Sequence, residues 1–212
     1  MSLYIPDAFA VTDHAAIERL IKEHPFATLI TPAASEPWIS HIPLLAAEGE
    51  KQGGGMLIGH FARSNPHWQH AGEAESIAIF HGPHAYVSPS WYDQPAQAVP
   101  TWNFTAIHVH GTLEIVDDSL KTRGVLDALI ERFEGHRPAP WRLALPDRQR
   151  DAMIGAIVAF KMPIRRIDAK FKLSQNRSRN DRLRVIAALR DEGYSEATQT
   201  AVWMHAYAGV DE

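Results

Sequence analysis

The sequence predicts a mainly β protein, an antiparallel barrel with helical additions and helices at its C-terminus. Short β-rich runs separated by glycine- and proline-containing turns recur through the first 116 residues. Helical patterns occur between them only occasionally, whereas a doubly wound parallel sheet needs strands and helices to alternate one to one. The length of 212 residues fits one full domain, or one domain with a small appendage.

The first part of the chain predicts one helix followed by three strands. Residues 13–24 form a helical pattern, because Ile17, Leu20 and Ile21 share one face and Pro25 follows the end. The three predicted strands are residues 26–31, 38–45 and 56–62, and the glycine-rich stretch 48–55 predicts a flexible hairpin connection between the last two.

The middle of the chain continues the strand pattern after one interruption. Ser64 or Asn65 can cap a short helix that begins at Pro66. The next predicted strands are residues 76–81, 85–88 and 103–116, and the long loop 89–102 separates the last two. Loops of this length in compact domains are often functional. In the last strand one face (Ile107, Val109, Leu113, Ile115) is apolar and predicts core, whereas the other is wet or lies at an interface.

The last hundred residues predict mostly helices. Helices are expected at 118–134, 147–154, 179–191 and 196–208, with a strand or bent pair of strands at 157–172. The composition changes after Asn176, so we predict a barrel domain at 1–176 and a helical appendage at 177–212. Five arginines gather in the appendage: Arg177, Arg179, Arg182, Arg184 and Arg190. The two helices could read DNA, but a packing appendage with a solvated basic face is favoured.

Composition and charge exclude several classes of protein. The net charge of -4 gives the whole molecule no electrostatic footprint for nucleic acid. The absence of cysteine excludes disulfides, thiolate metal sites and cysteine nucleophiles. The N-terminus does not have the pattern of a signal peptide, and no apolar run reaches membrane-spanning length. We therefore expect a soluble, cytoplasmic protein.

Two stretches are candidates for binding a ligand. Residues 81–111 combine aromatic side chains with histidines and prolines, which indicates either a pocket for a flat ligand with polar edges or a stiff loop packed by its own aromatics. At residues 60–65 an arginine, a hydroxyl and an amide lie where a strand passes into a helix start. That arrangement favours a phosphate, although a helix cap with an exposed arginine explains it equally well.

The sequence also bears on three other kinds of site: a metal site, a catalytic nucleophile and a heterocycle-binding edge. His108, His110 and Glu114 form an HxHxxxE pattern that resembles the first metal motif of cupins, but the flanking glycines and a downstream histidine motif are missing. A polar strand face at an interface is therefore favoured, and no metal is predicted.

No serine nucleophile motif occurs, and no catalytic residue is assigned. Gln175 and Asn176 offer the donors and acceptors that suit a heterocycle edge, although nearby serines could simply cap the next helix.

Four motifs in this order resemble the PaiB family of FMN-binding proteins: HFARSNPHW, AYVSPSWY, VPTWNF followed by HVHG, and KFKLSQNRSRNDR. That family is described as negative transcriptional regulators with the flavin-reductase-like split-barrel fold, and the resemblance covers nearly the whole chain. The chain also resembles the wider pyridoxamine-phosphate-oxidase-like split barrels, which are typically homodimers with FMN in the subunit groove. It departs from the family pattern at Asp168-Ala169, where the family has glutamate and glycine.

The resemblance implies FMN as cofactor and twelve binding residues. His60, Arg63, Ser64 and Asn65 would hold the phosphate, and His41, Ile42 and Pro43 would lie along the ribityl chain or the isoalloxazine. Thr101, Trp102 and Asn103 would enter the flavin pocket, from this chain or from the other subunit, and Gln175 and Asn176 would approach a ring edge or the pocket mouth.

Two functions follow from the resemblance. The first is an FMN-binding, homodimeric negative regulator of transcription whose basic C-terminal helices contact DNA or a partner. The alternative is an FMN-dependent oxidoreductase that acts on a small molecule, with the aromatic loop as a lid and the flavin supplying the chemistry. A cupin-like metal protein is a minor third possibility.

Overall fold

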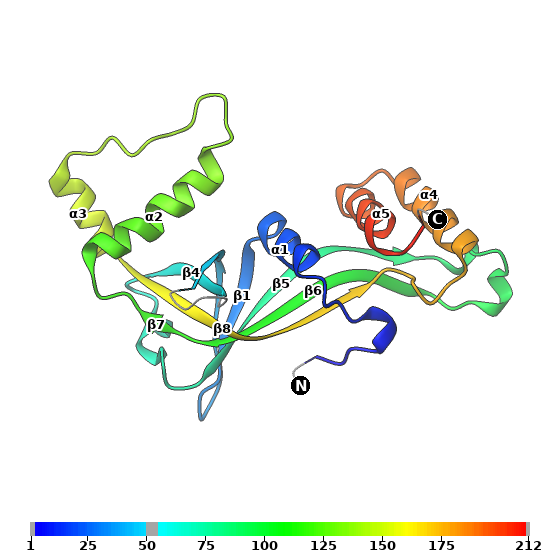
Figure 1. Ribbon diagram of the computed structural model, residues 1–212, viewed down its shortest axis with the longest axis horizontal. Coiled ribbons are helices and arrows are strands. Elements are labelled where there is room, and N and C mark those ends of the chain that lie inside the picture. Colours follow the sequence, from blue (N-terminus) through cyan, green and yellow to red (C-terminus); the bar gives the residue numbers. More distant parts are fainter. Residues whose placement is uncertain (1–2, 50–54, 211–212) are drawn as a thin grey trace. The chain divides into compact units, whose positions relative to one another are not determined.

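The computed structural model describes residues 3–49 and 55–210. Most of the hairpin connection predicted at 48–55 lies outside the described residues. An eight-stranded sheet dominates the structure, with strand order β2-β1-β5-β6-β8-β4-β3 and β7 paired to β8 (Figure 1). The pairings β1–β2, β1–β5, β3–β4, β4–β8 and β7–β8 are all antiparallel. The prediction of a mainly β, antiparallel split-barrel fold with helical additions is confirmed.

The elements have the following bounds. The strands are β1 Phe26–Thr31, β2 Trp38–Pro43, β3 Leu45–Glu48, β4 Gly55–Ala62, β5 Glu75–Val87, β6 Thr101–Thr112, β7 Glu114–Ile115 and β8 Ile157–Lys172. The α-helices are α1 His14–Glu23, α2 Ser119–Glu134, α3 Asp147–Gly155, α4 Arg179–Asp191 and α5 Ser195–Tyr207. Four short 3-10 helices complete the chain: η1 Asp7–Phe9, η2 Pro66–His70, η3 Pro89–Trp91 and η4 Pro95–Gln97.

The chain forms two compact units. The first consists of residues 1–24, 80–108 and 168–212, and the second of residues 25–79 and 109–167. Strands β5, β6 and β8 each contribute residues to both units. The predicted domain boundary after residue 176 lies within the first unit and stays a prediction.

The first unit has an aromatic core built by α1, β8 and α5. Phe171 on β8 meets the edge of Trp203 on α5, with ring centroids 5.3 Å apart. The guanidinium of Arg19 on α1 lies 4.8 Å from the Trp203 ring centroid, which favours a cation–π contact. Helix α1 begins as predicted, because the Asp13 carboxylate accepts the backbone N–H of Ala15 at its first turn.

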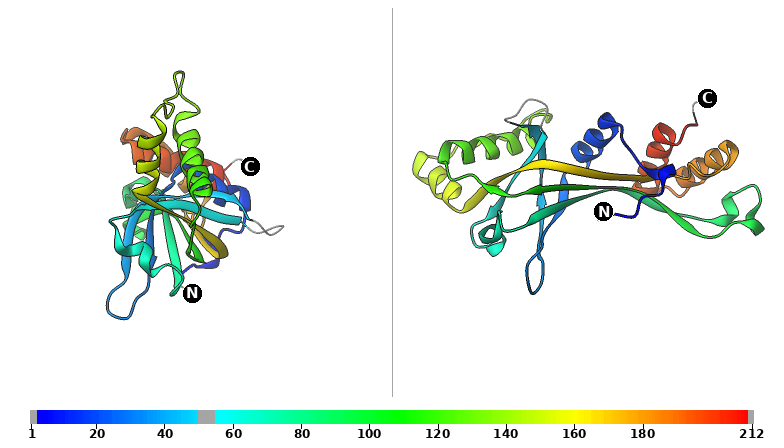
Figure 2. Two further views of the ribbon diagram at one scale, coloured as in Figure 1. Left: turned by 90° about the vertical axis from the view of Figure 1, so that its left-hand side faces the viewer. Right: turned by 60° about the horizontal axis from the view of Figure 1, so that its bottom comes forward.

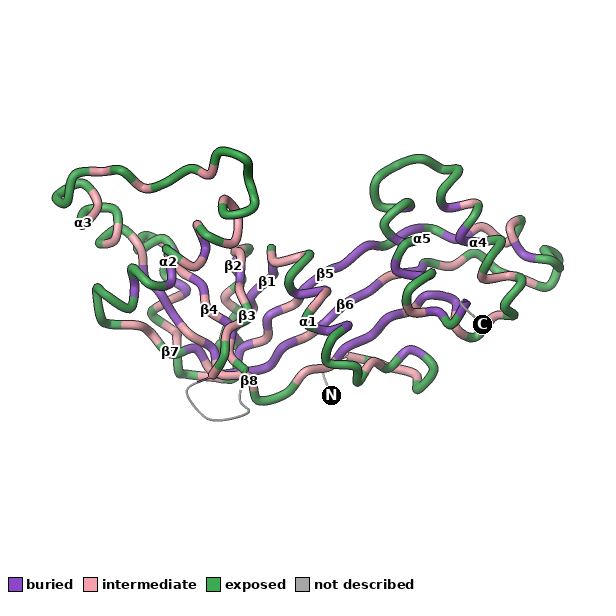
Figure 3. The backbone as a smooth tube through the Cα atoms, turned by 45° about the horizontal axis from the view of Figure 1, so that its top comes forward, coloured by how far each residue is buried: buried purple, intermediate pink, exposed green. Residues whose placement is uncertain are grey.

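The core of the second unit lies between strands β4 and β8 and the helix that covers them. Phe61 of β4 stacks on Phe160 of β8, with ring centroids 4.7 Å apart. Val125 and Leu129 of α2 pack against Ala159, so one apolar face of that helix is buried. Residues 136–146 form the long loop from α2 to α3, and much of this loop is exposed (Figures 2 and 3). No helix of the described chain is long and apolar enough to span a membrane.

Three strand predictions were wrong at their boundaries. The strand expected at 103–116 is divided into β6, which begins at Thr101 within the predicted loop, and β7. The strand expected at 38–45 is divided into β2 and β3, because the N–H of buried Leu44 donates to the Pro25 carbonyl rather than to a neighbouring strand. The strands expected at 76–81 and 85–88 are one strand, β5. It passes through Gly82 at a point where an added Cβ would lie 2.1 Å from Oγ1 of Thr105. The glycine therefore permits a close strand contact instead of marking a turn.

Candidate functional site

The first group of predicted flavin residues lies where β4 ends, in a segment we call the β4 turn (residues 62–66). The Arg63 side chain is exposed, yet its Nε donates to the Gly155 carbonyl at 2.5 Å and its Nη2 to the Ile157 carbonyl at 2.8 Å. The Arg63 backbone N–H donates to the Ala156 carbonyl at 2.8 Å. The β4 turn is therefore tied to the junction between α3 and β8. The guanidinium has five N–H donors, so it can still bind an anion from solvent.

Asn65 performs the capping role expected for this segment. Its Oδ1 accepts the backbone N–H of His67 at 3.0 Å, and η2 follows with Pro66 at its first position. Its Nδ2 donates to Oγ of Ser40 at 3.0 Å. Ser64, in contrast, is exposed. Within the turn, Arg63 and Ser64 are thus exposed to solvent, while the Asn65 amide forms hydrogen bonds with Ser40 and His67.

His60 carries an unsatisfied polar atom. Its Nδ1 is buried and has no hydrogen-bond partner among the residues that the structure describes. Burial lowers the pKa of His60, so the ring is neutral at neutral pH. A buried imidazole nitrogen without a partner is unusual, and a ligand group is one way to satisfy it.

The second strand brings His41, Ile42 and Pro43 towards the same place. The Pro43 carbonyl oxygen lies 3.2 Å from the position that a Cβ on Gly59 would occupy, so the end of β2 lies against β4 beside His60. The hydrogen bond between Asn65 and Ser40 also joins β2 to the β4 turn. The two stretches that carry seven of the twelve predicted flavin residues therefore lie close together in the second unit, although the His41 side chain is exposed and its Nδ1 lies 3.1 Å from Oγ1 of Thr28 on β1.

The other five predicted residues meet in the first unit. Lys172 Nζ donates to Oγ1 of Thr101 at 2.7 Å and to the Trp102 carbonyl at 2.6 Å. Burial, and then the nearby Lys170 and Arg177, lower the pKa of Lys172. The Trp102 side chain is 54% exposed and meets Tyr86 edge-on at 6.1 Å. This exposed aromatic pair beside a cation is a surface on which a flat ligand could stack.

The amides of Asn103 and Gln175 have structural roles. Asn103 is fully buried, and its amide donates to and accepts from Oγ of Ser174 at 3.0 and 3.1 Å. Ser174 adopts φ 67°, a left-handed conformation that non-glycine residues seldom occupy. Gln175 accepts the Leu173 N–H and donates to the Phe171 carbonyl. These contacts hold the turn after β8, while Asn176 is exposed. Direct flavin contacts of these residues stay predictions.

A buried polar network next to the β4 turn was not predicted. His67 is fully buried, with Nδ1 2.8 Å from Oγ of Ser40 and Nε2 2.8 Å from Oγ1 of Thr31. Thr31 Oγ1 lies 2.7 Å from Oγ of Ser76. One signal was present in the sequence: Ser40 and Thr31 lie at strand positions where alternation predicts core side chains. A polar residue at such a position needs a buried partner.

We expect the His67 network to make stability depend on pH. Burial, with a smaller contribution from His70, lowers the pKa of His67 to about 4, below its ordinary value of 6.5. The unfolded chain therefore takes up a proton first. Stability should be complete above pH 6.5 and should fall as the pH drops from 6.5 towards 4, by about 2 to 3 kcal/mol. Urea unfolding at pH 7.5 and 4.5 measures this loss.

The matched variant is His67→Asn, which cannot titrate in this range. Its stability should be lower than that of the original protein at pH 7.5 but should change less between the two pH values. His24, His60 and His81 also have pKa values lowered by burial, so some dependence on pH should remain. An undiminished pH dependence in the variant would contradict the assignment to His67.

The HxHxxxE pattern does not build a metal site. The described part of the chain contains no group of three or more His, Asp or Glu side chains placed to hold a metal ion. His110 is buried, and Nη2 of Arg166 lies 3.2 Å from its Nε2. Glu114 pairs with Lys161 at 3.5 Å. Positive side chains thus stand where a cation would have to bind. This strand face was expected to be wet or to lie at an interface. His110 is instead buried within the chain, whereas His108 and Thr112 on the same face are half-buried.

The arginines of the C-terminal helices bind their own chain. Arg179 and Arg182 donate to the carbonyls of Val210 and Gly209, and Arg184 donates to the Trp91 carbonyl. Arg177 lies 4.6 Å from the centroid of the Tyr92 ring. Four of the five guanidiniums therefore contact protein groups, which supports the packing interpretation over a DNA-reading surface.

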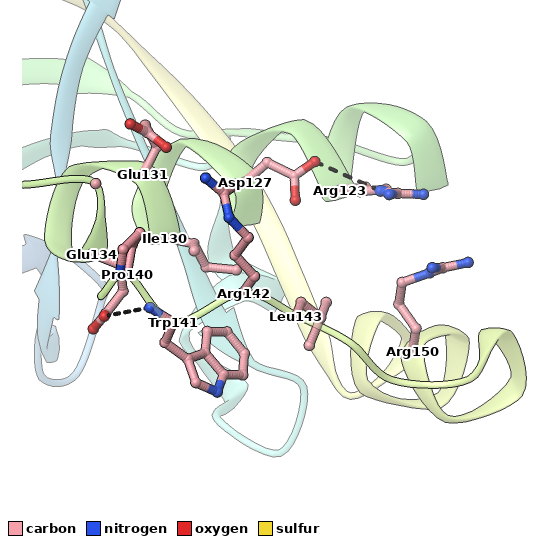
Figure 4. A pocket seen from close by; sticks show the side chains of 11 residues that line it. Arg123, Asp127, Ile130, Glu131, Glu134, Pro140, Trp141, Arg142, Leu143 and Arg150 are labelled. Carbon is pink, nitrogen blue, oxygen red and sulfur yellow. Dashed lines mark hydrogen bonds and ion pairs between the residues drawn. The ribbon is translucent and has the colours of Figure 1, made fainter. Parts of the chain in front are cut away.

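A cavity of about 330 Å³ lies in the second unit between α2, the loop after it and α3 (Figure 4). Among the described residues its lining includes none of the twelve predicted flavin residues. Its charges are largely paired at the rim, with Arg123 beside Asp127 and Arg150 beside Asp147. The cavity therefore does not change the location of the candidate site.

Comparison with known proteins points to flavin binding. The family model described as "Putative FMN-binding domain" matches residues 3–166. The chain is 36% identical to the protease synthase and sporulation protein PAI 2 of Bacillus subtilis, over 95% of this chain and 96% of that protein. It is 30% identical to an uncharacterized protein of Saccharomyces cerevisiae, over 64% of this chain and 93% of that one.

Solved structures support the fold. The FAD and heme binding protein of Mycobacterium smegmatis matches with a TM-score of 0.59 and 20% identity, over 76% of this chain and 72% of that one. The flavocytochrome Anf3 of Azotobacter vinelandii matches with a TM-score of 0.60 and 13% identity, over 77% and 69%. At these identities the likeness concerns the fold alone.

Proposed function

The chain belongs to the FMN-binding domain family whose model it matches, and from this premise we propose that it is a flavoprotein that holds the FMN phosphate at the β4 turn and oxidises or reduces a small molecule. FMN is its cofactor. The observation that carries the location is the buried Nδ1 of His60, which has no partner within the described structure and belongs to the strand that leads into the exposed Arg63 and Ser64.

The donors at this place fit a phosphate. The guanidinium of Arg63 supplies charge-assisted N–H donors, and the Ser64 hydroxyl can donate to a phosphate oxygen. The neutral His60 ring can donate from Nδ1 when its tautomer places the proton there. The fixed backbone of the turn reduces the entropy lost on binding. The isoalloxazine supplies the redox chemistry when FMN is bound, while this chain binds and orients it.

An apolar sheet face in the second unit supports a homodimer, as in the split barrels that the sequence resembles. The cross-strand neighbours Ile39, Ile30 and Ile77 form one row on this face, and His41, Thr28 and Ile79 form the next. These side chains are half-buried or exposed, and the exposed fraction of Ile39 is 54%. Four of the six are isoleucines, whereas Thr28 and His41 are polar and contact each other. A mainly apolar face of this kind suits a second copy of the chain. Sedimentation equilibrium should give the mass of a dimer, and a monomer mass would refute this part of the proposal.

A negative transcriptional regulator of PaiB type is the second candidate. The sequence resemblance favours it, and the relative from Bacillus subtilis extends over nearly the whole chain. Its physical support is weaker, because the net charge is -4 and most guanidiniums of the C-terminal helices bind carbonyls or rings of their own chain. A regulator of this kind would depend on a partner or on a small basic patch for DNA contact.

The two candidates predict different spectra. We expect purified protein to bind FMN and to show the visible absorbance band of an oxidised, bound flavin. Anaerobic NADPH should then bleach that band. A bound flavin that NADPH leaves oxidised, together with salt-dependent binding to DNA, would favour the regulator instead. Absence of FMN binding would contradict both.

A further inference from the structure

We propose that Ser40 and His67 are positioning residues for the FMN phosphate, acting through Asn65; this inference rests on the proposed function. Neither side chain need touch the flavin. Their role is to fix the β4 turn in the geometry that presents Arg63 and Ser64 to the phosphate.

The first reason is a closed ring of hydrogen bonds behind the turn. Asn65 Oδ1 accepts the His67 N–H, and Asn65 Nδ2 donates to Ser40 Oγ, both at 3.0 Å. Ser40 Oγ in turn lies 2.8 Å from Nδ1 of His67. Three side chains therefore define one another's positions, and Asn65 is held at both ends of its amide. Because Asn65 lies two residues after Arg63, fixing it fixes the backbone that carries the phosphate ligands.

The second reason is that two members of the ring are buried and Asn65 is half-buried, so the ring cannot easily rearrange. Ser40 is 5% exposed and His67 is fully buried. The His67 ring lies 5.0 Å from the ring of Phe61, at the end of β4. In such an environment each hydroxyl or ring nitrogen without a partner costs stability, so the arrangement with every bond made is strongly preferred.

The third reason is that the turn has further supports that leave Arg63 and Ser64 open to solvent. The Asn65 N–H donates to the Ala62 carbonyl at 2.9 Å, and Nε1 of Trp68 donates to the Arg63 carbonyl at 3.0 Å. Backbone and amide groups thus support the turn. The Arg63 side chain also donates to the carbonyls of Gly155 and Ile157, yet it remains exposed, as does Ser64. Such a division is typical of a preorganised anion site, in which little has to be ordered when the anion arrives.

The network also supplies its own matched control. Ser40 and Ser76 are both buried serines on strands, and both belong to the network around His67. Ser40 bonds directly to Asn65, whereas Ser76 contacts Thr31 on the far side of the His67 ring. Replacing either by alanine removes one buried hydroxyl, but only Ser40→Ala removes the support of the β4 turn.

The experiment compares the binding of FMN with that of riboflavin, which lacks the phosphate, by fluorescence titration of the full chain. Ser40→Ala should weaken FMN about tenfold and leave riboflavin nearly unchanged. Ser76→Ala should lower stability to a similar extent but preserve the ratio of the two affinities. Should Ser40→Ala fail to fold, Ser40→Cys keeps the volume, weakens the hydrogen bonds and permits the same comparison.

The remaining outcomes would contradict either the positioning role of Ser40 and His67 or the location of the phosphate site. If Ser40→Ala weakens both flavins equally, or Ser76→Ala changes the ratio as much, the network is merely structural and the positioning role is wrong. If the unmodified protein itself binds FMN and riboflavin equally well, the β4 turn does not hold the phosphate. That result overturns the proposed location as well as this inference.

Discussion

Replacing Gly111 by alanine is expected to cost at least about 3 kcal/mol of folding stability, and the variant should be largely unfolded if the protein is marginally stable. A Cβ at Gly111 would lie 2.3 Å from the Pro163 carbonyl oxygen and 2.8 Å from Cγ of Met162. The first of these is a backbone atom of β8. It cannot retreat without disturbing the ladder in which Met56 pairs with Pro163 and Leu57 with Met162. Circular dichroism and urea unfolding measure the loss.

Gly124→Ala is the comparison for this variant. Gly124 lies inside α2, and no atom of the described structure other than those of its own helix turn and chain neighbours comes within 4 Å of an added Cβ. Alanine there should raise stability by about 0.5–1 kcal/mol, since glycine loses more backbone entropy in a helix. Wild-type stability in Gly111→Ala would show that β6 and β8 do not approach as closely as the structure places them.

Helices with local signals could be predicted closely from the sequence, because their limits depend on adjacent residues. Asp13 caps α1 and Asp118 caps α2, each through its own carboxylate, where the helices predicted at 13–24 and 118–134 begin. Strand β5 could not be predicted in the same way. Gly82-Pro83 is locally a turn signal, and only the contact of Gly82 with Leu20 and Thr105 shows why a glycine is needed within a strand.

The candidate site shows the same difference between features set by adjacent residues and features set by contacts between distant residues. Arg63, Ser64 and Asn65 are adjacent in sequence, and their motif offered Ser64 or Asn65 as a cap, which the structure shows at Asn65. The anion-binding role of the exposed Arg63 and Ser64 stays a prediction. Ser40 and His67 are 27 residues apart, so their hydrogen bond depends on how η2 folds back against β2. A motif likewise cannot tell whether an amide faces a ligand or its own backbone. Gln175 was predicted at a flavin edge, and its amide bonds to Leu173 and Phe171.

Arg63→Ala should raise the dissociation constant of FMN about 10- to 100-fold, because a charge-assisted hydrogen bond contributes roughly 1.5–3 kcal/mol. Riboflavin affinity should change much less, since the lost charge faces the phosphate. The structure adds a second consequence, because the same guanidinium donates to the carbonyls of Gly155 and Ile157. These hydrogen bonds are exposed, and water can replace the lost donors, so the fold should survive with a loss of about 1 kcal/mol.

Two further variants separate charge from geometry. Arg63→Lys keeps the positive charge but cannot span two carbonyls and an anion with one planar group, so FMN affinity should lie between the wild-type and alanine values. Arg165→Ala removes a charge of the same unit at a side chain that is 67% exposed and 3.6 Å from Glu75, and should leave FMN affinity unchanged. Equal weakening by Arg165→Ala would mean that net charge, not the β4 turn, attracts the flavin. Unchanged affinity in Arg63→Ala would remove the phosphate from this turn, whatever the result for riboflavin.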